Sequence, residues 1–422
     1  MSIIHWGVAA AIAVSTPSIL AAGTNTGLKY ISTSGDYIGG GQTRTLTPPG
    51  ATVTVTGTAQ LVRVNVTDPS NWWYLDFAAP SSANLTKGSY PAASRYPFQS
   101  PMEPGLSMSG NGRGCNQLKG WFRVREYVRD AAGTVKSLAI DYLQNCEVTG
   151  PPLYGAIRYN SKFALKVPTT AAIAGPDFAT LELRDTVLDG TQSFTRRAGG
   201  LSYQWTQTEG PTVELKSATT ATPSFTAPAV GIAGTTLRFK LDTTDRKGET
   251  STDDVIVVVN SKAAPRTEAR FGGDPGDYIT GGVTREYNVV NSTIRFSRNY
   301  DGGVSASVSG DTWWNFDTAA PEGQVYKPGT YANAQRFPFQ SATAPGLSLS
   351  GAGRGCNTLT GSFVVYQAEF DTAGNPTVAD IAFEQYCEGG KAKSYGEFVL
   401  NAVPHGMVQR QLAAARKRSP RE

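Results

Sequence analysis

The sequence predicts an all-β protein of three β-sandwich-like domains, in which a duplicated, disulfide-containing module flanks a different central domain. Three observations support this. Segments such as 52–56 and 62–66 alternate apolar and polar residues with period two, as half-buried strands do. The 46 glycines and 25 prolines, with only 17% charged residues and no long helical pattern, are typical of turn-rich β structure. A long stretch also occurs twice, and 422 residues leave room for about three domains.

The repeated stretch has two parts. Arg95-Tyr-Pro-Phe-Gln99 returns as Arg336-Phe-Pro-Phe-Gln340, and Ser109-Gly-Asn-Gly-Arg-Gly-Cys-Asn116 returns as Ser350-Gly-Ala-Gly-Arg-Gly-Cys-Asn357, each 241 positions later. Most other shared residues keep nearly the same offset. The sequence therefore predicts one module at 28–161 and a second copy at 268–403.

The four cysteines fall into one pair per copy, and the members of each pair are 31 positions apart. They are Cys115, Cys146, Cys356 and Cys387. Neither a C-x-x-C motif nor neighbouring histidines accompany them, which disfavours a metal site. We expect one disulfide within each module, and hence an oxidising compartment.

Both ends of the chain differ from the modules. Residues 1–23 are mostly apolar and end in Ala21-Ala22-Gly23, which predicts a signal peptide, although a retained N-terminal anchor would look similar and the leader has no Lys or Arg. Residues 404–422 form a basic tail, interpreted as flexible, with a membrane-surface or partner-docking role as the alternative. No further membrane span is expected after leader removal. These features predict a secreted or cell-surface protein.

The central segment, 172–261, has a different character. It contains Gly175-Pro-Asp177, Leu188-Asp-Gly190, Tyr203-Gln-Trp-Thr-Gln207, Phe225-Thr-Ala-Pro228 and Val255-Ile-Val-Val-Val259. Taken together, these phrases resemble the PKD-like or immunoglobulin-like domains of bacterial exported proteins. The resemblance implies a seven-stranded sandwich with Trp205 in its core, a spacer or adhesion role, and no catalytic residues. The flanking modules look like an uncharacterised domain of bacterial secreted proteins.

Composition excludes several kinds of chemistry. The only histidines are His5, in the leader, and His405, after the second copy, so histidine-based triads and metal sites are not expected in the folded domains. With the cysteines assigned to disulfides, no thiol nucleophile remains. The formal charge of +4 comes partly from the tail, so no nucleic-acid partner is expected.

Carboxylates are the remaining candidates for catalysis. Those shared by both copies are Asp36/Asp277, Asp76/Asp317 and Glu147/Glu388, and three arginines are shared as well: Arg44/Arg285, Arg95/Arg336 and Arg113/Arg354. Structural ion pairs and turns are the simplest interpretation. A glycosidase pair, with Asp76 and Glu147 first, and Ca²⁺ binding are the alternatives. In the central domain Asp242, Asp245, Asp253 and Asp254 are interpreted as solvated charges, with Ca²⁺ again the alternative.

Two features suggest a binding surface. Trp72-Trp73 and Trp313-Trp314 are adjacent tryptophans on predicted strands, so one of each pair should face the core and the other should face outward. An outward tryptophan near Tyr74 or Tyr90 would form an aromatic platform for sugars, whereas packing under a loop is the alternative. The Gly-rich segment could bind an anion beside Arg113 or Arg354, or could simply be a tight turn in which the arginine caps carbonyls.

We therefore expect a non-enzymatic binding protein with no required cofactor, whose partner is an extracellular glycan or a surface protein and whose two binding faces are held apart by a spacer. A structural or assembly component and a carboxylate-based glycan hydrolase are the alternatives. The candidate ligand-binding residues are Trp72, Trp73, Tyr90, Arg95 and Arg113 in the first copy, and Trp313, Trp314, Tyr331, Arg336 and Arg354 in the second.

Overall fold

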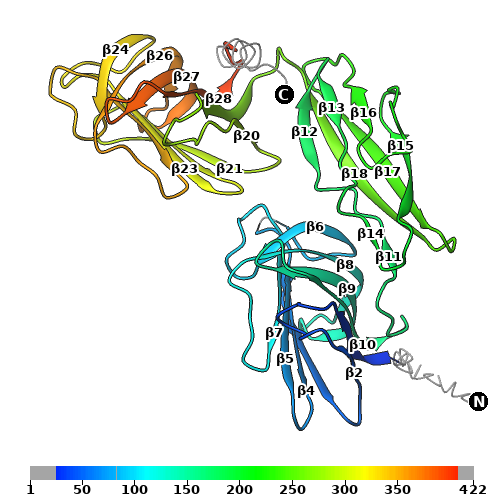
Figure 1. The fold of residues 1–422 in the computed structure, drawn as a ribbon. Helices are drawn as coiled ribbons and strands as arrows, with labels where there is room; N and C mark the ends of the chain where they lie inside the picture. The colour runs from blue at the N-terminus through cyan, green and yellow to red at the C-terminus, as the bar shows by residue number, and fades with distance from the viewer. Residues whose placement is uncertain (1–24, 82, 407–422) are drawn as a thin grey trace, which may run out of the picture.

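The computed structural model describes residues 25–406 except residue 82, and within that range every regular element is a β-strand (Figure 1). The predicted signal peptide and most of the basic tail lie outside the described residues. The part of the chain that is described contains no helix long and apolar enough to cross a membrane. The prediction of an all-β protein is confirmed.

The first module is built from ten strands in one sheet, ordered β2-β1-β10-β9-β8-β6-β7-β5-β4-β3. Every neighbouring pair is antiparallel except β6–β7. The strands are β1 (Asn25–Ser32), β2 (Thr43–Leu46), β3 (Thr52–Gly57), β4 (Leu61–Thr67), β5 (Trp72–Ala78), β6 (Gly88–Arg95), β7 (Gly105–Gly110), β8 (Leu118–Arg129), β9 (Val135–Cys146) and β10 (Pro152–Ser161).

The second module repeats this topology strand for strand, in the order β20-β19-β28-β27-β26-β24-β25-β23-β22-β21. Its strands are β19 (Arg266–Gly273), β20 (Arg285–Asn288), β21 (Thr293–Arg298), β22 (Val304–Ser309), β23 (Trp313–Ala319), β24 (Gly329–Arg336), β25 (Gly346–Gly351), β26 (Leu359–Phe370), β27 (Pro376–Cys387) and β28 (Lys393–Ala402). The duplication read from the sequence is therefore also a duplication of structure.

Each module folds its single sheet back on itself. Strands near opposite ends of the order pack face to face, such as β3 against β9 and β21 against β27. The alternation of apolar and polar residues along the strands explains this packing, because β4 buries Val62, Val64 and Val66 and exposes the residues between them. The apolar faces of the two halves enclose one core per module, so the sandwich-like shape comes from one continuous sheet.

The central domain, coloured green in Figure 1, is smaller. Its main sheet has the order β12-β18-β17-β15, and two short pairs, β11–β14 and β13–β16, complete it. Trp205 is buried in its core, as expected. The strands are β11 (Thr170–Ala171), β12 (Phe178–Leu181), β13 (Asp185–Val187), β14 (Phe194–Thr195), β15 (Leu201–Glu209), β16 (Ser224–Thr226), β17 (Thr235–Asp245) and β18 (Thr250–Asn260).

The central domain is joined to the first module by packing and by charge. Trp121 of β8 packs with Ala171, Ile173 and Phe194 in a small apolar cluster. Beside it, the Arg123 guanidinium donates to the carbonyl of Thr252 at 2.9 Å and to the Asp253 carboxylate at 3.2 Å. Burial raises the pKa of Asp253, and the nearby Arg123 charge partly offsets that rise.

Both expected disulfides are present. Cys115 is bonded to Cys146 and Cys356 to Cys387, each with a Cα–Cα distance of 5.2 Å. Each bond ties the end of a long strand, β9 or β27, to the residue that follows the Gly-rich turn. The disulfide thus anchors the repeated segment to the core sheet.

We predict that removing one disulfide lowers the stability of its own module. In the chain-entropy model, a 31-residue separation corresponds to roughly 3–4 kcal/mol of unfolding free energy. The Cys115→Ser/Cys146→Ser variant should therefore show a new, earlier unfolding transition by calorimetry. A single unshifted transition in this variant would show that the disulfide is not what holds the turn.

Candidate functional site

The tryptophan pairs divide as strand alternation requires. Trp73 is 1% exposed and packs edge-on to Tyr30, with ring centroids 5.2 Å apart, whereas Trp72 is 41% exposed. Trp314 is likewise buried and Trp313 exposed. Trp73 and Trp314, which were both candidate ligand contacts, are therefore core residues, because successive side chains of a strand point to opposite faces. Trp72 and Trp313 remain as candidates.

Trp72 lies on an outward face together with a second aromatic residue of β5. Tyr74 is 47% exposed, and its ring centroid lies 5.3 Å from that of Trp72 with the planes tilted by 49°. Directly paired residues share a face of the sheet, so Asn65 of β4 and Ser109 of β7, the partners of Tyr74, flank this aromatic pair. We call Trp72, Tyr74, Asn65 and Ser109 the platform.

An ion pair borders the platform on the same strands. Arg63 Nε donates to Asp76 Oδ1 at 3.0 Å, and the same guanidinium donates to the Tyr96 hydroxyl at 3.1 Å. Burial raises the pKa of Asp76, and the Arg63 charge opposes that rise. This outward face therefore combines stacking rings with hydrogen-bonding groups.

The repeated Gly-rich segment fixes the platform strand. The Trp72 N–H donates to Asn111 Oδ1 at 2.9 Å, and the Asn111 N–H donates back to the Trp72 carbonyl at 3.2 Å. Gly110, at the end of β7, lies against both tryptophans, and a Cβ there would come within 2.2 Å of the Trp72 carbonyl oxygen and 2.6 Å of the Trp73 ring. Only glycine permits this approach.

The equivalent face of the second module is simpler. Trp313 is exposed, but Asn315 stands where the first module has Tyr74, and Ser305 stands where it has Arg63. Asp317 accepts a hydrogen bond from Ser305, and burial raises the pKa of this carboxyl. The two modules therefore share their topology but present different side chains on this outward face.

The two repeated tyrosines are structural. Tyr90 stacks on Phe122 with ring centroids 4.6 Å apart, and its hydroxyl exchanges hydrogen bonds with the Thr86 backbone. Tyr331 stacks on Phe363 in the same way. Tyr74, rather than Tyr90, is therefore the aromatic neighbour of Trp72.

The arginines of the repeat support turns. The Arg95 guanidinium lies over the Phe98 ring at 4.7 Å and donates to the Asn116 carbonyl, and Arg336 does the same with Phe339 and Asn357. This leaves the Phe98 and Phe339 rings exposed at rigid turns.

Arg354 donates to the Tyr278 and Ile279 carbonyls, at 3.1 and 3.4 Å, and the Arg113 guanidinium lies against Gly40, the counterpart of Gly281. The Gly-rich segment is thus a tight turn with a carbonyl-capping arginine, at least in the second copy, rather than an anion site.

The shared carboxylates also have structural partners. Glu147 accepts from the Asn116 N–H at 2.9 Å, and the N–H groups of Asn357 and Thr358 lower the pKa of Glu388. Asp36 accepts from the Gly39 N–H at 2.7 Å within a turn, and Asp277 does the same for Thr280. Of the first pair considered for glycoside hydrolysis, Asp76 is therefore engaged in an ion pair and Glu147 in a turn.

The acidic residues of the central domain are held by cations. Asp242 pairs with Lys240, Asp245 with Arg197, Asp253 with Arg123 and Asp254 with Arg238. Among the described residues no group of three or more metal-ligating side chains comes together.

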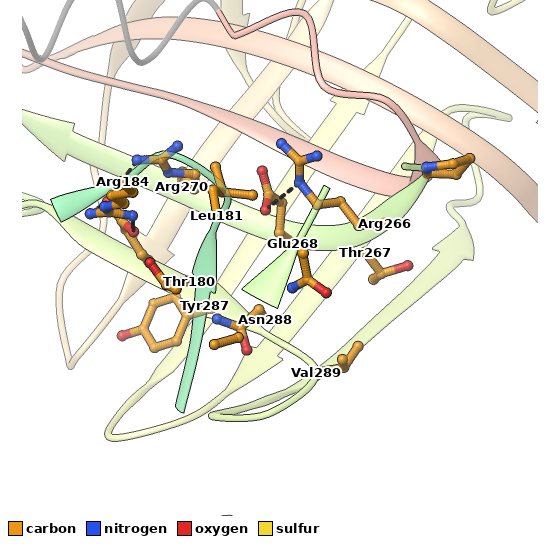
Figure 2. Close-up of a pocket in the computed structure, with 14 residues that line it drawn as sticks. Thr180, Leu181, Arg184, Arg266, Thr267, Glu268, Arg270, Tyr287, Asn288 and Val289 are labelled. Atoms are coloured by element: carbon orange, nitrogen blue, oxygen red, sulfur yellow. Dashed lines mark hydrogen bonds and ion pairs between the residues drawn. The ribbon is translucent and has the colours of Figure 1, made fainter. Parts of the chain in front are cut away.

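A cleft of about 230 Å³ lies where the central domain meets the second module (Figure 2). Arg184 of the central domain and Arg270 of β19 both donate to Glu286, at 2.8 and 2.6 Å, and Arg266 pairs with Glu268 at 2.8 Å. The neighbouring guanidinium charges lower the pKa of Glu286, against the effect of its burial. Because these charges are used in pairing, we interpret the cleft as a joint between domains.

One cluster of the second module has no counterpart in the first. The buried carboxyls of Asp380 and Glu397 lie on adjacent strands, and His405 Nδ1 contacts Asp380 Oδ2 at 2.7 Å while its ring stacks on Tyr366. In the first module the corresponding face instead holds Arg158 paired with Asp141 at 2.7 Å. Because the two acids are buried, we interpret the cluster as a structural contact that fixes the segment after β28 to the sheet, and not as a ligand site.

This cluster predicts a pH dependence of stability. Burial and the neighbouring Asp380 raise the pKa of Glu397 to about 8, so the folded state holds a proton that the unfolded chain releases near pH 4.5. The stabilisation is complete below pH 4.5 and is lost as pH rises toward 8. Melting temperatures measured from about pH 5 to 9 should therefore fall more steeply for the native protein than for Glu397→Gln. Parallel curves would contradict the assignment.

Comparison with known proteins identifies the central domain. A family model for a PKD domain matches residues 174–259. These residues form a PKD-like domain. A comparison with curated proteins finds no significant match.

Among solved structures, the PKD domain from the KIAA 1837 protein aligns at 31% identity over 23% of this chain and 93% of its own, with a TM-score of 0.20. A nucleoside hydrolase-related hypothetical protein from Saccharophagus degradans, described as associated with carbohydrate metabolism, aligns at 14% identity over 22% of this chain and 26% of its own, with a TM-score of 0.19. A PKD-like domain between two disulfide-bonded modules is consistent with an extracellular location.

Proposed function

We propose that this chain is a secreted or cell-surface, non-enzymatic binding protein and that the platform of the first module binds glycan. The observation that carries the proposal is the outward pair Trp72 and Tyr74, two tilted rings on one strand bordered by short polar side chains. Such rings offer large, rigid apolar faces at a low cost in conformational entropy.

The polar border suits a sugar better than an apolar ligand. Asn65 and Ser109 flank the rings, and the Arg63–Asp76 pair offers donors and acceptors a short distance along the same face. A pyranose presents a C–H face that stacks on an aromatic ring and a rim of hydroxyls that hydrogen-bond. The platform matches both, and the shared carboxylates that would serve a hydrolase are engaged in turns and ion pairs.

We predict that Trp72→Ala abolishes or strongly weakens binding of the glycans that the platform recognises, without unfolding the protein. Loss of a central aromatic contact typically costs more than about 1 kcal/mol, so affinity should fall by about fivefold or more. Because Trp72 is half-exposed, its removal should cost less than about 1 kcal/mol of stability. A glycan array of the mature protein, followed by titration calorimetry on the best glycan, measures the loss of binding.

Tyr37→Ala is the matched control, since Tyr37 is an exposed tyrosine of the same module outside the platform. Near-UV circular dichroism checks that both variants are folded. Equal binding by the native protein and Trp72→Ala would contradict the proposal, as would the absence of any glycan ligand.

A further inference from the structure

The second module carries an exposed aromatic side chain that the first lacks. The hairpin between β21 and β22 ends in Asn299-Tyr-Asp-Gly-Gly303, and Tyr300 at its tip is 75% exposed. The equivalent hairpin of the first module, between β3 and β4, has Thr58-Ala-Gln60 at its turn and no aromatic residue. The hairpin leads into β22 at Val304, which pairs with Thr318, so it lies at the opposite end of β23 from Trp313.

The ring contact of Tyr300 stands where the first module has a different interaction. There, the Arg63 guanidinium lies over the Tyr96 ring at 5.6 Å. In the second module Phe337 stands at the position of Tyr96, and Tyr300 packs against it with ring centroids 5.4 Å apart and planes tilted by 35°. A cation–aromatic pair has thus become an aromatic pair, whose outer ring is free to stack on a ligand.

A groove runs past this ring. One part, of about 550 Å³, is lined by Tyr300, Pro338, Gln340 and Glu322, and an adjoining part, of about 510 Å³, is lined by Val325 and Phe370. The linings of the two parts share Arg298, Asp301, Gly302, Gly323 and Gln324, so we treat them together as one groove. We call it the hairpin groove. Its size falls within the range of small-molecule sites.

The chemistry of the hairpin groove fits a sugar. Amides, a guanidinium and carboxylates supply planar hydrogen-bonding groups around one aromatic face. Gln340 is already oriented, because its Nε2 donates to Asp301 Oδ2 at 2.8 Å. Desolvation raises the pKa of the Tyr300 phenol, and the carboxylates of Asp301 and Asp317 raise it further.

We propose that the hairpin groove is a second saccharide-binding site, built on Tyr300 and chemically distinct from the platform of the first module. The inference rests on the proposed glycan-binding function and extends it: the two modules bind different sugars rather than two copies of one epitope.

The test compares full-length Tyr300→Ala with Trp72→Ala, the Tyr300→Ala/Trp72→Ala double variant and the native protein on the same glycan array. Tyr278→Ala is the control, because Tyr278 is an exposed tyrosine of the second module outside the groove. We expect Tyr300→Ala to weaken binding about 5- to 30-fold on a set of glycans that Trp72→Ala leaves bound, and the double variant to bind neither set. Tyr278→Ala should behave as the native protein.

Each other outcome has a separate meaning. If Tyr300→Ala retains every interaction while Trp72→Ala loses its own, the hairpin groove is not a site and the platform still stands. If only Tyr300→Ala loses binding, the groove stands and the platform fails. If the native protein binds no glycan, both proposals are overturned.

Discussion

The close approach of a glycine to a tryptophan pair is the contact on which each module depends. Gly110 lies against the Trp72 backbone and the Trp73 ring, and Gly351 lies in the same way against Trp313 and Trp314. Because the glycine has no side chain, β5 and β7 can pair in register while a whole indole fills the core beneath them. In the first module Trp73 therefore anchors β5 to the core, and the same strand presents Trp72 at the surface.

This contact connects the most repetitive part of the sequence with the most ligand-like part of the surface. In the first module the Gly-rich turn is bonded to the platform strand through Asn111, and the disulfide that follows the turn ties it to the core sheet. A rigid support lowers the entropy that binding must overcome. The repeated segment is therefore interpreted as the support of a binding face rather than as a binding site itself.

Much of the fold could be predicted because its signals are local. Alternation indicated the strands, an offset of 241 indicated the two modules, and cysteine spacing indicated the disulfides. The adjacent tryptophans also revealed that one of each pair must face out. The choice between Tyr74 and Tyr90 as the aromatic neighbour of Trp72 was harder, because β7 lies between β5 and β6, the strand that carries Tyr90, and sequence spacing does not encode this strand order.

The features that differ between the copies were missed for another reason. Comparing the modules draws attention to shared residues, whereas Tyr300 and the Asp380–Glu397 pair occur in the second module alone. Their significance depends on neighbours brought together by the sheet, such as Phe337 beside Tyr300 and His405 beside Asp380. The only signal in the sequence was the single histidine after the second module, at the edge of the repeat.

The most direct test of glycan binding at the platform is ¹⁹F NMR of the protein labelled with 5-fluorotryptophan, titrated with the glycan that the array selects. Single Trp→Phe variants assign the resonances. We predict that the Trp72 resonance shifts on binding, while that of Trp73, the next residue along β5 but facing the core, stays in place. A Trp72 resonance that does not move while glycan binds would place the binding face elsewhere and contradict the proposed function.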